Sequence, residues 1–245
     1  SGVTGITVTE GKLSVAADSN LGTGAVTLDG GALEVTGNTF ATPVDNDIVL
    51  GVDGGTLRVD TGVMFHHSGV ISGDGVLTKT GVGVLMLTGS VGNTYEGGTA
   101  IDEGQVTVGA ELNTSVPSVF GAGAVTIADG VSVNFNTAAT VDNDISVAGS
   151  GVGGLGAIRL YGADVTVNGL LTLTGNTALD PGSEQTLTLA GGVTDGNNDY
   201  TLTNLWYGTI ALTGAASNWT GGVTTVLPGA ISITDQTSIG SGKIT

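Results

Sequence analysis

The chain contains no cysteine and has few prolines, aromatic residues and basic residues: its 245 residues include 4 Pro and 5 Lys plus Arg. Without cysteine, a disulfide framework is excluded. Because 22 Asp plus Glu outweigh the basic residues, the formal net charge is -17, which disfavours binding to nucleic acid or to anionic membranes. No apolar run is long enough for a transmembrane helix. The first residues lack the basic and apolar stretches of a signal peptide, so we expect none here.

Short runs of Val, Leu, Ile and Thr dominate the sequence and are bounded by Gly, Asp or Asn. Such runs are typical of β-strands separated by tight turns, and no segment has the sustained 3.6-residue period of a helix. We therefore predict an all-β fold with essentially no helix. The predicted strands span residues 5–8, 12–15, 25–28, 32–35, 47–50, 56–59, 76–79, 84–87, 105–108, 124–127, 132–135, 144–147, 157–160, 164–167, 170–173, 185–189, 201–205, 209–212 and 230–233.

Internal repeats discriminate among the all-β architectures. The pattern of Gly11–Val15 recurs at residues 104–108 and 229–233, and the pentapeptide VDNDI of residues 44–48 returns unchanged at 141–145. The long period is roughly one hundred residues and unequal, which suits a solenoid whose coils contact only their neighbours rather than a closed propeller. We predict one continuous parallel β-helix segment over residues 1–245, part of a longer chain, with repeat copies near 4–28, 73–127 and 208–245.

The best-developed repeat has a recognisable pattern. Residues 75–81, 85–89, 93–101 and 104–108 read GVLTKTG, LMLTG, NTYEGGTAI and GQVTV, and this order resembles the autotransporter-associated β-strand repeat, also called the passenger-associated transport repeat. The match is strong over residues 73–108 and partial over 208–233, where Trp219 takes the Tyr position; a half-copy lies at 4–15.

This resemblance implies a right-handed β-helix in the passenger region of a Gram-negative autotransporter, located outside the cell or on the outer-membrane surface. It also implies a role in adhesion or self-association, with the repeat serving passenger folding and export rather than catalysis. The expected partners are the chain itself or a glycan or protein of a host or surface. We expect no cofactor, no catalytic residue and no insertion of this segment into a membrane.

The repeated Asp residues are the first candidate site: Asp45 and Asp47, with their counterparts Asp142 and Asp144, could bind calcium, which prefers clustered oxygen ligands. Because the same pentapeptide occurs twice, turn formation by Asx side chains is the favoured interpretation. Whether calcium binds there stays open. The two histidines, His66 and His67, would point to opposite faces of a regular strand, so we expect a loop or surface role rather than metal binding.

Two further groups bear on carbohydrate chemistry. Polysaccharide lyases and hydrolases also use parallel β-helices, but Arg58 and Arg159 lie in different repeats, and Asp180 and Glu184 flank an ordinary Pro-Gly turn. The aromatic residues Trp206, Tyr207 and Trp219 could form a sugar-contacting patch, although Trp219 is expected to pack at a corner.

The sequence therefore predicts a structural or adhesive rod and not an enzyme. Two alternatives stay open. One is a subunit of an extracellular fibre that polymerises end to end, and the less favoured one is a polysaccharide lyase or hydrolase. Thr-x-Thr pairs also suggest an ice-binding face, but they are too irregular to favour it.

Overall fold

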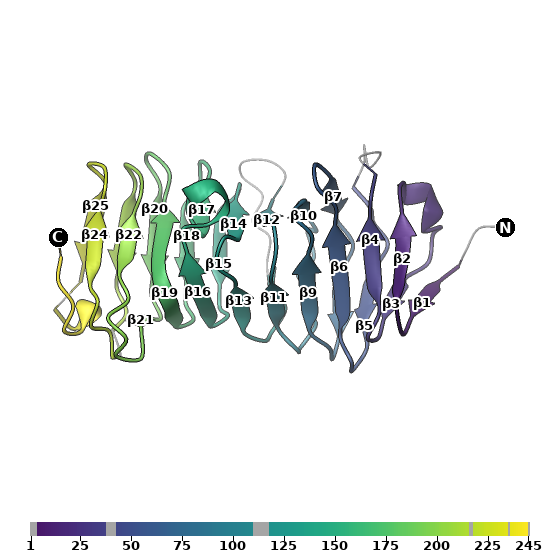
Figure 1. The fold of residues 1–245 in the computed structure, drawn as a ribbon, viewed down its shortest axis with the longest axis horizontal. Helices are drawn as coiled ribbons and strands as arrows, with labels where there is room; N and C mark the ends of the chain where they lie inside the picture. Colours follow the sequence, from purple (N-terminus) through teal and green to yellow (C-terminus); the bar gives the residue numbers. More distant parts are fainter. Residues whose placement is uncertain (1–3, 38–42, 110–117, 216–217, 235, 245) are drawn as a thin grey trace.

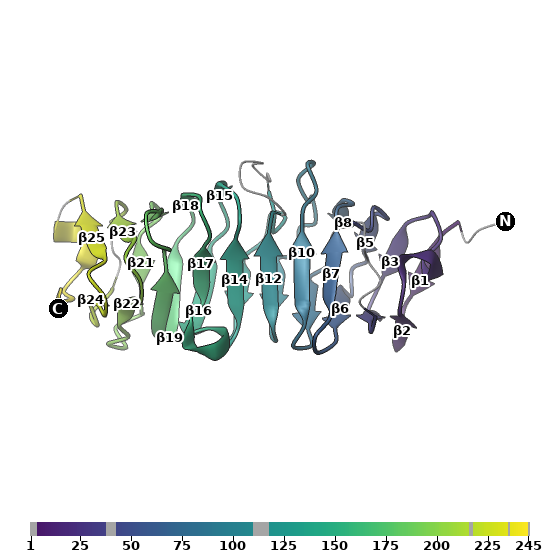
Figure 2. The same cartoon turned by 90° about the horizontal axis from the view of Figure 1, so that it is seen from above.

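A computed structural model of the protein shows an elongated β-solenoid of about 10 turns, in which successive coils lie side by side along the long axis (Figures 1 and 2). The structure describes residues 4–37, 43–109, 118–215, 218–234 and 236–244. Every strand pair in these ranges is parallel, and partners lie one coil apart, as for Ile6 with Val26 and Val26 with Ile48. The predicted all-β parallel solenoid is confirmed.

The coils contribute their strands to three sheets. The first sheet contains β1 (Ile6–Val8), β3 (Val26–Leu28), β5 (Ile48–Leu50) and β8 (Ile71–Gly73). Another is built from β15 (Ala139–Val141), β18 (Val165–Val167), β20 (Thr186–Leu189), β23 (Thr209–Leu212) and β25 (Ala230–Ile233).

The largest sheet has two runs of strands that meet at one long strand, β19 (Leu171–Asp180). One run contains β2 (Lys12–Val15), β4 (Ala32–Val35), β6 (Gly55–Val59), β9 (Leu77–Thr80), β11 (Thr99–Ile101), β13 (Val125–Ile127), β16 (Ile145–Gly149) and β21 (Val193–Thr194). The other contains β7 (Met64–His67), β10 (Val84–Leu87), β12 (Gln105–Val108), β14 (Ser132–Phe135), β17 (Ile158–Leu160), β22 (Leu202–Asn204) and β24 (Val223–Thr225). Because the first half of β19 pairs with β16 and its second half with β17, this strand turns the corner of its coil.

Helical structure in the described ranges is limited to three short 3-10 turns: η1 (Asp18–Asn20), η2 (Val152–Gly154) and η3 (Gln236–Ile239). No helix there is long and apolar enough to cross a membrane. Each predicted strand corresponds to a strand of the structure, within a few residues. The sequence prediction missed β7, β8, β11, β15, β21 and β24, along with the second half of β19.

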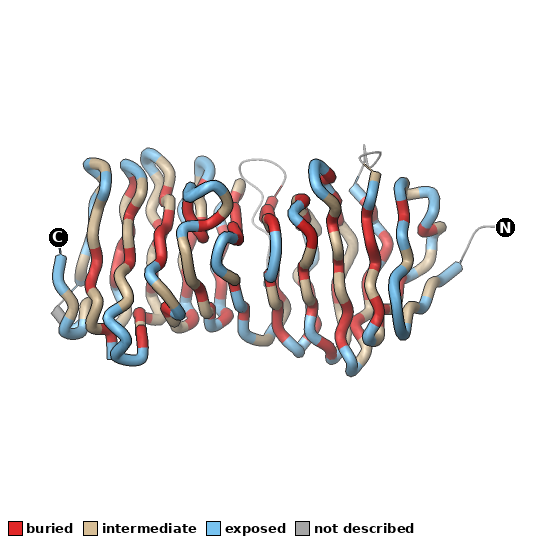
Figure 3. Tube along the Cα trace, in the orientation of Figure 1, coloured by how far each residue is buried: buried red, intermediate tan, exposed pale blue. Residues whose placement is uncertain are grey.

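The core runs along the inside of the coils, where buried and outward-facing residues alternate (Figure 3). Residues in register stack on one another from coil to coil, as Leu85 does on Phe65 and Val106. Stacking of like apolar side chains gives each coil its hydrophobic contact with its neighbours.

The paired glycines of the repeat permit close approach of two coils. A Cβ on Gly97 would lie 2.4 Å from the carbonyl carbon of Gly75 in the preceding coil. Its neighbour Gly98 has a φ of +89°, a conformation that other residues rarely adopt. The Gly-Gly step of the repeat is thus fixed by backbone packing rather than by a ligand.

Candidate functional site

An aromatic groove on the outer surface is the best-formed candidate site in the described residues. It encloses roughly 340 Å³, within the ~300–1,000 Å³ typical of ligand pockets. Three successive coils contribute to it, through the end of η2 and the residue after it, the strand β17 and the residue after it, the end of β19, and the turn after β22. Its lining residues are Gly154, Leu155, Arg159, Tyr161, Asp180, Leu205 and Trp206; we call this the aromatic groove.

An ion pair between Arg159 and Asp180 lies in the aromatic groove. The two residues are in register on β17 and β19, and Arg159 Nε donates to Asp180 Oδ2 at 3.3 Å. Both side chains are largely buried, with 14% and 13% of their surfaces exposed, so the pair is shielded from solvent. Asp180 Oδ1 also accepts a hydrogen bond from Gly182 N at 2.9 Å, which fixes the carboxylate.

Aromatic side chains flank this ion pair. The Arg159 guanidinium carbon lies 4.9 Å from the ring centroid of Tyr161, a cation–π contact. Burial raises the pKa of Tyr161, and the charge of Asp180 adds to this effect while Arg159 opposes it, so the phenol stays protonated at neutral pH. Trp206 and Tyr207 pack edge to face, with their ring centroids 5.5 Å apart. Tyr161, Trp206 and Tyr207 are the strongly exposed aromatic residues of the described ranges.

Buried polar side chains hold the loops around the aromatic groove. Asn204, which is fully buried, accepts a hydrogen bond from Trp206 N and donates to the carbonyl oxygens of Gly208 and Ala230. On the other side, Ser132 Oγ donates to Gly156 O at 2.8 Å and accepts from Val152 N at 2.9 Å. These contacts pre-organise both loops, so a ligand would not have to order them.

The sequence did not predict that the residues of the aromatic groove lie together. It places Arg159 alone in its repeat and Asp180 in an ordinary turn, whereas the structure pairs the two across adjacent coils. The aromatic trio is also divided, since Trp206 and Tyr207 are exposed while Trp219 is buried and donates from Nε1 to Tyr200 O. Trp219 and Tyr95, which share the same repeat position, are both buried, as the repeat alignment predicts.

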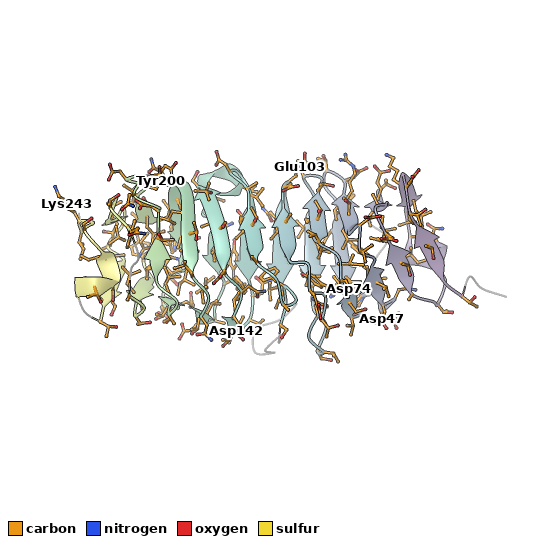
Figure 4. All side chains as sticks on the ribbon, turned by 90° about the horizontal axis from the view of Figure 1, so that it is seen from below. Asp47, Asp74, Glu103, Asp142, Tyr200 and Lys243 are labelled. Atoms are coloured by element: carbon orange, nitrogen blue, oxygen red, sulfur yellow. The ribbon has the colours of Figure 1, made fainter. Side chains whose placement is uncertain are left out.

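The repeated Asp residues connect neighbouring coils. Asp47 Oδ1 accepts a hydrogen bond from Val70 N at 2.9 Å, and Asp144 Oδ1 accepts one from Leu170 N at 2.8 Å. Figure 4 shows Asp47 and Asp142 at one edge of the rod and Glu103 at the opposite edge. For Asp47 and Asp144 the prediction of Asx bonding within the local turn is therefore corrected, because their carboxylates bond to the backbone of the following coil. In the described residues no three His, Cys, Asp or Glu side chains gather as a metal site would require.

The histidines both lie on strand β7, not in a loop. His67 is buried, and its Nε2 donates to Asn46 O at 2.9 Å. His66 lies on the other face, 2.7 Å from Thr88 Oγ1 through its Nε2. The prediction of opposite faces is confirmed, but the loop or surface role is wrong for His67. Burial lowers the pKa of both rings, so both are neutral at neutral pH.

A buried lysine is the feature that sequence reasoning missed most completely. Lys79 occupies an inward position, in register with Leu57 and Ile101, and has no exposed surface. Its Nζ lies 2.8–3.1 Å from four carbonyl oxygens, those of Thr80, Gly81, Gly83 and Glu103, so its three N–H groups are all engaged and one is shared between two acceptors. Burial lowers the pKa of Lys79 to about 8, so the ammonium is charged at neutral pH and ties two coils together.

Comparison with known proteins found one related sequence. Over 110 residues, or 44% of the chain, the sequence is 39% identical to the adhesin BmaC autotransporter of Brucella suis biovar 1 (strain 1330). The chain is similar to an autotransporter adhesin. It spans 3% of the length of that relative, so the resemblance concerns a small part of a long protein. No family model and no solved structure matches the chain.

The resemblance to autotransporter passengers that the repeats predicted is confirmed by this similarity together with the β-solenoid. The matched relative is named as an adhesin and not as an enzyme.

Proposed function

We propose that this chain is a segment of an autotransporter passenger, displayed on the bacterial surface or secreted, and that its solenoid carries adhesive contacts. Similarity to an autotransporter adhesin supports the class, and the parallel solenoid supports the architecture. The main support for adhesion is the aromatic groove. There, the exposed aromatic residues of the described ranges lie beside a shielded ion pair.

The distribution of exposed groups favours binding at the groove over binding elsewhere on the described surface. Aromatic side chains supply large contact areas at low entropic cost and are enriched at binding sites. The other large apolar side chains that are exposed include Val52, Val82 and Val226, each in a different coil, and isolated side chains of this kind are ordinary on a soluble surface.

The groove suits binding better than hydrolysis. Glycoside hydrolysis requires two carboxyl groups on either side of the scissile bond. Among the described residues that line the groove, Asp180 supplies one carboxylate, and that carboxylate is paired with Arg159. The Tyr161 phenol, protonated at neutral pH, is poorly suited to act as a base. These features favour recognition of a ligand that stays intact.

Attachment of coated microspheres tests the proposal. Microspheres carrying the purified chain are incubated with cultured epithelial cells, beside microspheres carrying an unrelated acidic protein of similar size. We expect the chain to increase attachment several-fold over the acidic control, because contact through the groove does not depend on net charge. Equal attachment of both would refute adhesion by this segment.

End-to-end polymerisation and lateral self-association stay predictions, which electron microscopy and light scattering of the purified chain can test. Isolated short rods of monomer mass support the passenger segment. Long uniform filaments would replace adhesion with fibre formation as the main role.

A further inference from the structure

We propose that the aromatic groove is a carbohydrate-binding site that recognises a neutral pyranose unit of a larger glycan. This inference rests on the proposed adhesive function and names its ligand class. The groove combines an exposed indole, a phenol and a shielded guanidinium–carboxylate pair, contributed by Trp206, Tyr161, Arg159 and Asp180.

The aromatic rings match the apolar face of a sugar. A pyranose ring presents a row of C–H groups on one face, and these carry partial positive charge. The face of an aromatic ring is negative because of its quadrupole, so the two faces attract each other. Trp206 is 44% exposed and Tyr161 is 42% exposed, which leaves ring surface available for such stacking.

The ion pair matches the hydroxyl groups of a sugar. Each hydroxyl donates one hydrogen bond and accepts others, so recognition requires donors and acceptors side by side. Arg159 uses Nε for Asp180, and its terminal nitrogens make no hydrogen bond to the part of the chain that the structure describes. Each oxygen of Asp180 accepts one hydrogen bond from the described residues, Oδ2 from Arg159 Nε and Oδ1 from Gly182 N, and retains further lone pairs.

Charge favours a neutral ligand over an acidic one. The carboxylate of Asp180 offsets the positive charge of Arg159 within the groove, at 3.3 Å. The chain as a whole carries a formal charge of -17, which repels anionic glycans at long range. A uronic or sialic acid would need an unpaired cation, and the described lining residues offer none.

The sheet beneath the groove disfavours an extended peptide as the ligand. Peptides that add a strand to a sheet need a free strand edge. Here β17 pairs with β14 and β19, β19 pairs also with β22, and β22 pairs with β24. The strands in this part of the sheet are paired on both sides, so a peptide cannot add here as a further strand.

A polar side chain next to the ion pair is also under-satisfied. Asn134 is in register with Arg159 on the neighbouring strand, and it is 6% exposed. Its Oδ1 has no hydrogen-bond partner in the described residues, although its Nδ2 donates to Gln105 Oε1. An unmet buried acceptor of this kind costs about 1–3 kcal/mol, and native proteins contain few of them.

The test is binding of the full 245-residue chain to an immobilised array of neutral hexose and N-acetylhexosamine oligosaccharides, with oligogalacturonates as the acidic probes. Each oligosaccharide that binds on the array is then titrated into the chain by isothermal calorimetry. We expect saturable binding of at least one neutral probe, at least tenfold weaker binding by Trp206→Ala, and weaker binding by Asp180→Asn. Val82→Ala, a matched change at an exposed site in another coil, should bind within about twofold of the native chain.

Three results would overturn the proposal: no saturable binding to any neutral probe, binding restricted to oligogalacturonates, or equal binding by Trp206→Ala and the native chain. Cleavage of a bound probe would replace binding by catalysis. Adhesion is a separate readout. If microspheres attach but no sugar binds, the glycan assignment fails alone, whereas if sugars bind but microspheres do not attach, the adhesive function fails alone.

Discussion

Asn46 and Asn143 make the same pair of hydrogen bonds in two distant coils. Asn46 Nδ2 donates to Gly22 O at 3.2 Å and to Gly24 O at 2.7 Å, and Asn143 Nδ2 donates to Gly121 O at 3.1 Å and to Gly123 O at 2.6 Å. The conserved pattern within the chain, Gly-x-Gly followed one coil later by VDNDI, is therefore a clamp between coils. Repeated motifs in this protein encode contacts between neighbouring coils.

Replacing either asparagine should destabilise the solenoid. Asn143→Ala leaves two carbonyl oxygens without their donor, so we expect the free energy of unfolding to fall by about 1–3 kcal/mol, and Asn46→Ala should behave alike. The two clamps share no partner, so the double variant should show the sum within about 0.5 kcal/mol. Urea titration measures these values. Asn168→Ala, at an exposed position, serves as the control, and an equal loss there would contradict the clamp.

Lys79 provides a second stability prediction. Lys79→Met removes the donor that serves four carbonyl oxygens, so the free energy of unfolding at pH 7 should fall by about 1–3 kcal/mol. The matched change Lys12→Met affects a lysine that is 59% exposed, and we expect it to change stability by less than about 1 kcal/mol. Equal effects of the two variants would show that the buried ammonium is not a tie between coils.

The pH dependence of Lys79 has a defined sign. Its pKa is about 8 in the folded chain and about 10.4 when unfolded, so the unfolded chain binds more protons between these values. The free energy of unfolding of the native chain, relative to Lys79→Met, should therefore rise with pH from about 8 to 10, by up to roughly 3 kcal/mol. Urea titrations at pH 7, 8, 9 and 10 measure it. A falling difference would contradict the assignment.

The two tryptophans should respond very differently to truncation. Trp219 is 1% exposed, and Trp219→Ala should lower the free energy of unfolding by about 3–5 kcal/mol through cavity formation. Trp206 is 44% exposed, so Trp206→Ala should cost less than about 1 kcal/mol while removing ligand binding. Thermal unfolding followed by circular dichroism separates the two. A large loss of stability in Trp206→Ala would mean that this residue supports the fold.

The carboxyl group of Asp195 should make the free energy of unfolding depend on pH in the acidic range. Burial raises its pKa, but hydrogen bonds from Thr220 N, Asn197 N, Gly221 N and Thr220 Oγ1 outweigh burial and leave the pKa below its usual value. Its stabilising contribution is therefore complete above about pH 4 and is lost as the pH falls through the folded value. Asp195→Asn should lower the unfolding free energy by roughly 2 kcal/mol at pH 7, and the gap should shrink below pH 4. A gap independent of pH would refute this role.

The sequence predicted the solenoid because strands such as 12–15 and 105–108 have strong alternation and because the repeats imply stacking. Strand β7 was missed since its Met-Phe-His-His sequence lacks β-branched residues. Lys79 shares the parity of Leu77, so alternation does place it inside, but a charged side chain argues against that reading until its carbonyl partners are known.

The residues of the aromatic groove could not be predicted to lie together from the sequence, because their proximity depends on the register between strands. Arg159 and Asp180 are 21 residues apart, which is close to the length of one coil. Because coil lengths vary, however, this separation alone does not determine which residues of neighbouring strands are in register. A one-residue shift in register would move either side chain to the other face of its strand. Only once β17 and β19 are paired do Arg159, Asp180 and Trp206 become neighbours on one surface.

The most direct test of the account is attachment of microspheres to epithelial cells, compared among the native chain, Trp206→Ala and Val82→Ala at equal coating density. We expect Val82→Ala to attach like the native chain, and Trp206→Ala to lose most of the attachment while staying folded. Attachment of Trp206→Ala equal to that of the native chain would place adhesion outside the aromatic groove and contradict the account.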